Sequence, residues 1–93
     1  ITLTVALYRH AGIRAVEVGS VMFGAKDAQG NALPARHELV RLAVPRRVYT
    51  QSHIDYVVEA IIEIFAQRAS ARGYQITEQP PFLRHFSARF AAL

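Results

Sequence analysis

Cysteine is absent from the 93-residue sequence. Its absence excludes disulfide bonds, thiolate nucleophiles and zinc sites built on thiolates. No apolar run approaches the roughly 20 residues that a membrane-spanning helix needs, so we expect no contact with the membrane interior. Lysine occurs once, as Lys26 beside Asp27 in a polar stretch. A solvated side chain is expected there, not the held and partly desolvated lysine that forms a Schiff base.

The formal net charge is +4, which comes mainly from arginine. Only Arg46 and Arg47 adjoin, so no basic run predicts a track for nucleic-acid phosphates. The four histidines are not spaced as a metal pair on one helix, the carboxylates do not cluster, and no glycine-rich phosphate loop follows a predicted strand. From spacing alone, therefore, no enzyme active site is predicted.

Hydrophobic residues make up 52% of the chain and charged residues only 19%. For a single small domain this composition indicates apolar surface that something else covers. The sequence begins at Ile1 and not at a methionine, so we expect residues 1–93 to be a piece of a longer product.

The first half of the chain predicts one helix and two strands. Residues 2–11 contain good helix formers and are followed by Gly12, a natural stop. Residues 13–23 mix β-branched and small residues and predict a bent strand, in which Gly19-Ser20 marks a bulge or a close approach. Residues 24–37 predict a loop, and residues 38–44 alternate as a second strand that ends at Pro45.

The second half predicts a helix and two more strands. The helix begins at a cap on Thr50 or Ser52, with Asp55 completing a capping-box pattern, and it closes at Gly73. Its apolar residues recur at helical spacing on one face and are Ile54, Val57, Val58, Ile61, Ile62 and Phe65. Residues 74–78 and 82–90 predict strands on either side of Pro80-Pro81. The predicted fold class is α+β, a mostly antiparallel sheet with helices packed on one face.

Arg41 is a charge inside an apolar strand and therefore requires an explanation. An unpaired guanidinium in an apolar setting is costly, and its planar fork suits a carboxylate or a phosphate. The simplest interpretation is a strand arginine that pairs with a carboxylate of the chain or extends to water. For His85 the corresponding interpretation is a half-exposed histidine on a strand.

Three strings in the sequence, VEVGSVMFG, ELVRLAVPRRVYTQSHIDYV and PPFLRHFSARF, resemble the C-terminal end of the β-eliminating lyases, the family of tryptophanase and tyrosine phenol-lyase. They occur in the same order as in that family, and the similarity of which they are the most specific parts covers nearly the whole chain. The resemblance implies that residues 1–93 are the small C-terminal domain of a fold-type-I enzyme. The upstream large domain, which binds pyridoxal phosphate, is absent from this sequence.

The resemblance also implies roles for three residues. Arg41 corresponds to the arginine that binds the α-carboxylate of the amino-acid substrate. Val18 stands where tyrosine phenol-lyase has an arginine, and His85 stands where it has a phenylalanine. Both positions are of the tryptophanase kind, which implies tryptophan as substrate and indole, pyruvate and ammonia as products.

Further features are implied for the complete enzyme only. They are pyridoxal phosphate, a monovalent cation such as K⁺, a homotetramer and a cytoplasmic location. The Schiff-base lysine lies upstream, so residues 1–93 alone are expected to bind no cofactor and to be inactive. Two alternatives stay open at this point: a tyrosine phenol-lyase, and a non-catalytic α+β module whose basic surface binds an acidic partner.

Overall fold

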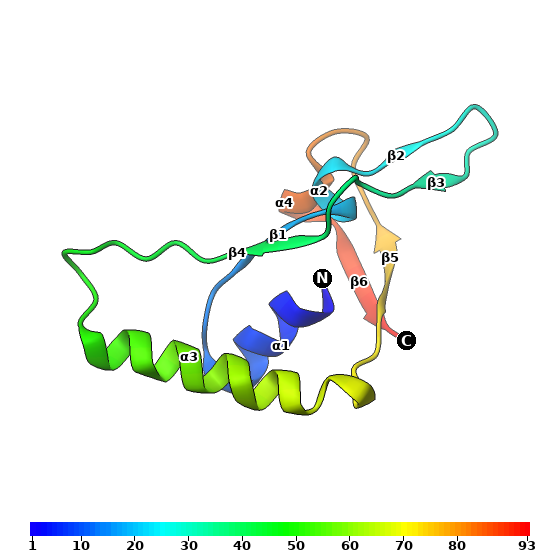
Figure 1. Cartoon of the computed structure of the whole chain (residues 1–93). Helices are drawn as coiled ribbons and strands as arrows, with labels where there is room; N and C mark the ends of the chain where they lie inside the picture. Colours follow the sequence, from blue (N-terminus) through cyan, green and yellow to red (C-terminus); the bar gives the residue numbers. More distant parts are fainter.

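The computed structural model describes residues 1–93 as an α+β arrangement of helices and short antiparallel strand pairs (Figure 1). The elements are, in chain order, α1 (Thr2–Ala11), β1 (Val16–Val18), α2 (Ser20–Phe23), β2 (Ala25–Lys26), β3 (Ala32–Leu33), β4 (Leu39–Arg41), α3 (Gln51–Ala66), the 3-10 turn η1 (Arg68–Ser70), β5 (Tyr74–Glu78), α4 (Arg84–Ser87) and β6 (Arg89–Ala92).

The strands form three separate antiparallel pairs, β1 with β4, β2 with β3, and β5 with β6. The prediction of antiparallel pairing is confirmed, whereas the prediction of one continuous sheet with helices on one face is wrong. Each strand is only two to five residues long and has a single hydrogen-bonded neighbour. Strand β1 ends directly before Gly19 and β5 ends just before Pro80-Pro81, two breaks that a strand does not continue through, whereas β4 already ends at Arg41, ahead of Pro45.

Two predicted strands contain helical turns. In residues 13–23 the strand ends at Val18, and the residues after Gly19 form α2. In residues 82–90 the backbone first turns at Leu83, which has a φ of 52°, into α4 and becomes extended only from Ala88. The predicted loop 24–37 also contains the short β2–β3 hairpin. The alternation of residues in 82–90 predicted a strand with its aromatic face packed. Phe82 and Phe86 are instead 82% and 78% exposed and do not pack on a neighbouring strand.

Helix α1 spans the predicted residues and packs on α3. Gly12 ends it in the left-handed conformation, with a φ of 67°. Leu7 is the one fully buried side chain, at 1% exposure, and Ala60 of α3 is also buried. The Tyr56 hydroxyl of α3 donates a hydrogen bond of 2.7 Å to the Ala11 carbonyl at the end of α1. This helix pair is therefore the centre of the small core.

Helix α3 begins at Thr50, one of the two predicted caps, but its capping partner is His53 and not Asp55. The Thr50 amide donates to His53 Nδ1 over 3.0 Å. Asp55 instead accepts a hydrogen bond from the Gln51 side chain. The helix ends at Ala66, before the predicted stop at Gly73, because the chain tightens into the η1 turn.

The predicted apolar stripe of α3 divides into two faces. Ile54, Val57 and Ile61 are partly covered, on the side that includes buried Ala60. The outer residues Val58, Ile62 and Phe65 are 50%, 64% and 47% exposed. The prediction that the whole stripe faces the core of this chain is thus wrong for the outer face.

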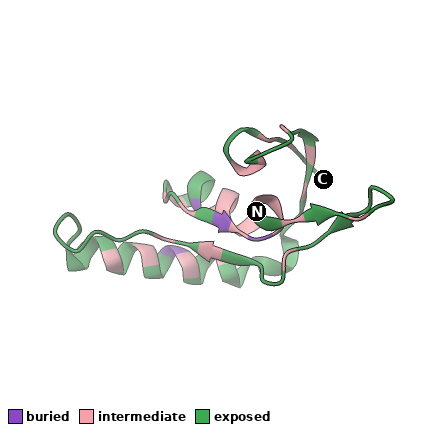
Figure 2. Ribbon diagram, turned by 90° about the horizontal axis from the view of Figure 1, so that it is seen from above, coloured by how far each residue is buried: buried purple, intermediate pink, exposed green.

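The chain is open and poorly buried, as the predominance of green in Figure 2 shows. Its accessible surface is 7600 Å², whereas a compact monomer of 10.4 kDa has about 5400 Å². Its radius of gyration is 15.1 Å, against about 12 Å for a compact domain of this length. Only four residues are buried. None of the helices is both long and apolar enough to cross a bilayer.

Candidate functional site

The two-stranded ribbon of β1 and β4 carries Arg41 and Val18 on one face. The register pairs Val16 with Arg41 and Val18 with Leu39. Because paired residues and residues two apart along a strand share a face, all four side chains lie on the same side of the ribbon. Arg41 and Val18 are diagonal neighbours on that face. A side chain as long as that of arginine can reach a diagonal neighbour. Glu17 and Val40 lie on the opposite, more buried face.

The Arg41 guanidinium is exposed and forms no hydrogen bond or ion pair with any other group of the chain. Of the two arms of the simplest interpretation, the internal carboxylate partner is therefore wrong, whereas extension of the side chain to water is what the structure shows. The predicted alternation holds from Leu39 to Ala43, because Val40 and Leu42 are partly covered while the other three residues are exposed. It fails at Val44, which is 47% exposed, and β4 ends at Arg41, before the predicted end of the strand at Val44. A planar guanidinium without an internal partner can accept a carboxylate through two parallel hydrogen bonds.

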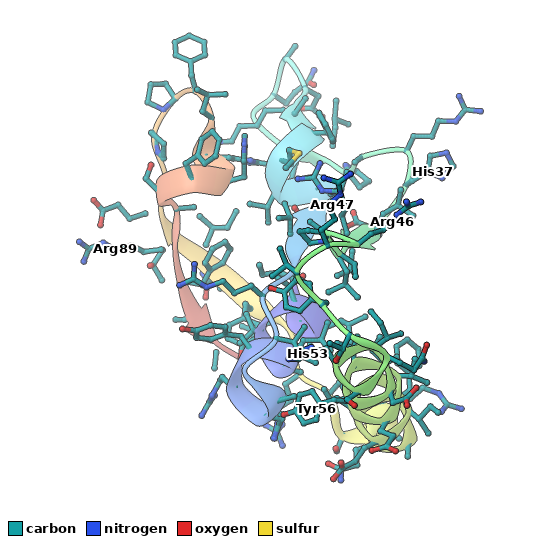
Figure 3. All side chains as sticks on the ribbon, turned by 90° about the vertical axis from the view of Figure 1, so that its left-hand side faces the viewer. His37, Arg46, Arg47, His53, Tyr56 and Arg89 are labelled. Atoms are coloured by element: carbon teal, nitrogen blue, oxygen red, sulfur yellow. The ribbon has the colours of Figure 1, made fainter.

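Arg41 lies at an open groove of about 770 Å³ between α1, α3 and the segment that follows β4. The lining is mostly apolar and includes Tyr8, Ile13, Val44 and Ile54. Figure 1 shows that residues 42–50 run away from β4 to the start of α3. Arg46 and Arg47, which Figure 3 labels, lie in a turn of this segment that the Val48 amide closes by donating to the Pro45 carbonyl; both are exposed. The two cations thus remain solvated, as expected for loop residues.

His85 lies on α4 and is half-buried. It was expected on a strand, and the helical turn places it differently, beside Phe86 with ring centroids 4.1 Å apart. Its Nδ1 atom is buried and has no hydrogen-bond partner among the groups of this chain. A buried polar nitrogen usually has a partner, so His85 has an unused hydrogen-bonding position.

Helix α2 joins the Val18 strand to the His85 helix and is held by charged side chains at both ends. At its amino end, Glu17 accepts hydrogen bonds from the Val21 and Met22 amides, each of 3.2 Å. Glu38 accepts from the Ser20 amide at 3.1 Å and from the Ser20 hydroxyl. The donation from the Ser20 hydroxyl, and after it that from the Ser20 amide, lowers the pKa of Glu38 below its ordinary value of 4.5.

Arg84 of α4 reaches the other end of α2. Its Nε atom donates to the Val21 carbonyl over 2.6 Å, and Nη2 donates to the Ser20 carbonyl. Its Nη1 atom donates to the Gln79 side chain over 3.1 Å. The structure therefore connects the strand of Val18 to the helix of His85 through α2, and the ribbon connects Val18 to Arg41.

Comparison with proteins of known name gives a consistent result. The chain is 56% identical over 87 residues to tryptophanase of Salinibacter ruber, a match that covers 94% of the chain and 18% of that protein. It is 52% identical over 91 residues to tryptophanase of Rhodobacter capsulatus, covering 98% of the chain and 20% of the relative. Tryptophanase of Escherichia coli is 44% identical over 87 residues. No family model matches the chain.

The chain matches the C-terminal part of the tryptophanases. It spans about a fifth of the length of these curated relatives. The predicted resemblance to the β-eliminating lyases, on the tryptophanase side, is confirmed. The similarity to tryptophanase extends over nearly all of the chain and so takes in Val18, Arg41 and His85.

The residues of this tryptophanase-like chain do not fit pyridoxal phosphate by themselves. Lys26, the single lysine, is exposed on the two-residue strand β2, where nothing desolvates it. It lines a small groove with Pro80, Pro81 and Arg84 that contains one hydrophobic residue. No cluster of three metal-ligating side chains is present either. A Schiff base with the cofactor therefore has no suitable lysine here.

Sequence reasoning missed Glu17, Glu38 and Arg84, although all three hold the site elements together. One signal was available, because Gly19-Ser20 was interpreted as a bulge or close approach. A Cβ atom on Gly19 would contact the carboxylates of both Glu17 and Glu38, so the close approach is confirmed. For Arg84 no such signal exists, since the contacts that join it to α2 are with backbone carbonyls more than 60 residues away.

Proposed function

We propose that residues 1–93 are the small C-terminal domain of a tryptophan indole-lyase and provide its substrate-binding side. The observation that carries the proposal is the unpaired Arg41 guanidinium on the same ribbon face as Val18, in a chain that matches tryptophanases over nearly its whole length. The overall reaction converts tryptophan and water into indole, pyruvate and ammonia.

Arg41 binds the α-carboxylate of the substrate in this proposal. Two parallel hydrogen bonds from a planar guanidinium fix both the position and the plane of a carboxylate. Because the carboxylate is attached to Cα, this contact also restricts rotation of the Cα substituents. Arg41 therefore contributes orientation and not proton transfer.

In this proposal Val18 and His85 face the leaving group of the substrate, which is indole. An apolar side chain at position 18 suits the indole ring better than a cation, because an unpaired charge beside an apolar ring is costly. The unpartnered His85 Nδ1 suits a polar or proton-transfer group near the leaving group. These two residues favour an indole-lyase over a tyrosine phenol-lyase.

Pyridoxal phosphate, held by the upstream part of the enzyme, would supply the electron-withdrawing chemistry of the reaction. The residues that hold the cofactor, the Schiff-base lysine and a monovalent cation belong to the upstream part of the enzyme in this proposal. We propose further that the complete enzyme is a cytoplasmic homotetramer.

The exposed surface supports docking onto that upstream part. The chain exposes about 2200 Å² more than a compact monomer of its mass. Interfaces of standard size bury about 800 Å² on each partner and permanent ones about 1000–2500 Å², so an excess of this size on one partner is enough for a permanent interface. The outer face of α3, formed by Val58, Ile62 and Phe65, is an apolar part of this surface.

A chimaera tests the proposal. Residues 1–93 replace the corresponding C-terminal fifth of Rhodobacter capsulatus tryptophanase, and the product is called the tryptophanase chimaera below. It should release indole, pyruvate and ammonia from tryptophan in equal amounts. Arg41→Ala should lower kcat/KM at least about 100-fold, on the scale of about 3 kcal/mol for a lost charged hydrogen-bond pair. Arg46→Ala, which removes an exposed loop arginine, is the matched control and should retain activity. A well-folded chimaera that leaves tryptophan intact would refute the proposal.

A further inference from the structure

Arg84 is the one charged side chain that connects α4 to α2. Three of its nitrogens are used, toward the Ser20 carbonyl, the Val21 carbonyl and the Gln79 side chain. Gly24 allows this approach, because a Cβ atom there would lie 2.5 Å from Nη2. A guanidinium has five donors in a rigid plane, so two carbonyls of one helical turn fix its orientation as well as its position.

The next residue in the chain is His85, and little else holds α4. Helix α4 has four residues, and no side chain caps its amino end. Its N-terminal neighbour Leu83 has a left-handed φ of 52°, a conformation that is unfavourable for a residue with a side chain and needs external support. Phe82 and Phe86 on either side are largely exposed and add little packing. The position of the His85 ring therefore depends on the neighbouring guanidinium.

Helix α2 is itself fixed to the Val18 strand. Glu17, which is 7% exposed, directly precedes Val18 and binds the Val21 and Met22 amides. Glu38, which directly precedes β4, binds the Ser20 amide. The amides of α2 thus donate hydrogen bonds to carboxylates in or next to the β1–β4 ribbon, whereas two of its carbonyls accept hydrogen bonds from Arg84 of α4. An unbroken set of hydrogen bonds runs from the ribbon to the residue beside His85.

We propose that Arg84 is a positioning residue that sets the place of the His85 imidazole relative to Val18 and thereby adapts the site to a leaving group that must be protonated. The inference rests on the proposed function. Arg84 contacts no substrate atom and acts only through His85. Its loss should therefore matter for indole, whose carbon must take up a proton, and matter little for a thiolate, which leaves without one.

The experiment is a double-mutant cycle in the tryptophanase chimaera with Arg84→Ala, His85→Phe and both together. Arg84→Ala should lower kcat for tryptophan about 30-fold and for S-methylcysteine less than about 3-fold. In the His85→Phe background, Arg84→Ala should add less than about 3-fold, because the residue through which it acts is already removed. Arg84→Lys, which keeps one charged donor, should recover part of the loss.

Two variants keep the test informative if Arg84→Ala folds poorly. Gln79→Leu removes only the partner of Nη1 and should give a smaller loss with the same substrate dependence. Arg89→Ala removes an arginine of the same segment whose pair with Glu78 is largely exposed, and Figure 3 shows Arg89 directed away from the rest of the chain. It should leave both activities unchanged.

Two results would overturn the inference while leaving the proposed function intact. One is an equal loss for both substrates in Arg84→Ala. The other is an unchanged effect of Arg84→Ala in the His85→Phe background. Arg84 would then stabilise the fold without acting through His85. If the wild-type chimaera does not cleave tryptophan, the proposed function fails and this inference fails with it.

Discussion

Ile62 on the outer face of α3 offers a quantitative test of docking. The side chain is 64% exposed in this chain, so an interface there would cover roughly two-thirds of it. Full burial of such a side chain stabilises by about 1.5–3 kcal/mol. Burial of the two-thirds that is still exposed would therefore contribute about 1–2 kcal/mol to the free energy of docking. Ile62→Ser loses that amount and leaves a hydroxyl without a partner, at a further cost of about 1 kcal/mol.

The expected loss of about 2–3 kcal/mol corresponds to a Kd for docking that is about 30–150-fold weaker. The assay titrates residues 1–93 against the upstream four-fifths of Rhodobacter capsulatus tryptophanase and measures binding by calorimetry. Glu59→Gln alters the same helix at an exposed polar position and should bind like the wild type. Wild-type affinity in Ile62→Ser would refute the assignment of the outer α3 face to the interface.

Three further predictions concern stability. Leu7→Ala should destabilise the α1–α3 core by about 2–5 kcal/mol and unfold the isolated chain, which circular dichroism would detect. His53→Ala should lower the stability of α3 by about 1 kcal/mol in chemical denaturation, because the Thr50 amide loses its acceptor. Because Ser20 lowers the pKa of Glu38, this carboxylate stabilises α2 above pH 4.5 and loses that effect as the pH falls through the lowered value. The Ser20 amide shift in an NMR titration should follow this transition, and Glu38→Gln should abolish it.

The sequence predicted the elements that rest on local chemistry. Helix α1 with its Gly12 stop, the helix after Thr50 and the strand before Pro45 depend on periodicity, caps and breakers close in sequence. It failed where distant contacts decide the conformation. The turn at Leu83 and the helix α4 depend on Arg84 reaching carbonyls more than 60 residues away, and no local pattern encodes that contact.

The candidate site was predicted in the same uneven way. A charge inside an apolar strand identified Arg41, and the resemblance to the lyases selected Val18 and His85 beside it. That Arg41 and Val18 share one ribbon face follows from the β1–β4 register, which the sequence did not give because the pairing partner of each strand was not predictable. The outer face of α3 could not be separated from the core face by period alone, since both are apolar.

The most direct test of the central claim compares tryptophan with tryptophan amide in the tryptophanase chimaera. If Arg41 binds the α-carboxylate, the wild-type chimaera should prefer the acid by a factor of about 100 or more in kcat/KM, and Arg41→Ala should reduce that preference to about 1. A preference for the acid that stays the same in Arg41→Ala would contradict the assignment, because the carboxylate would then be bound by another group.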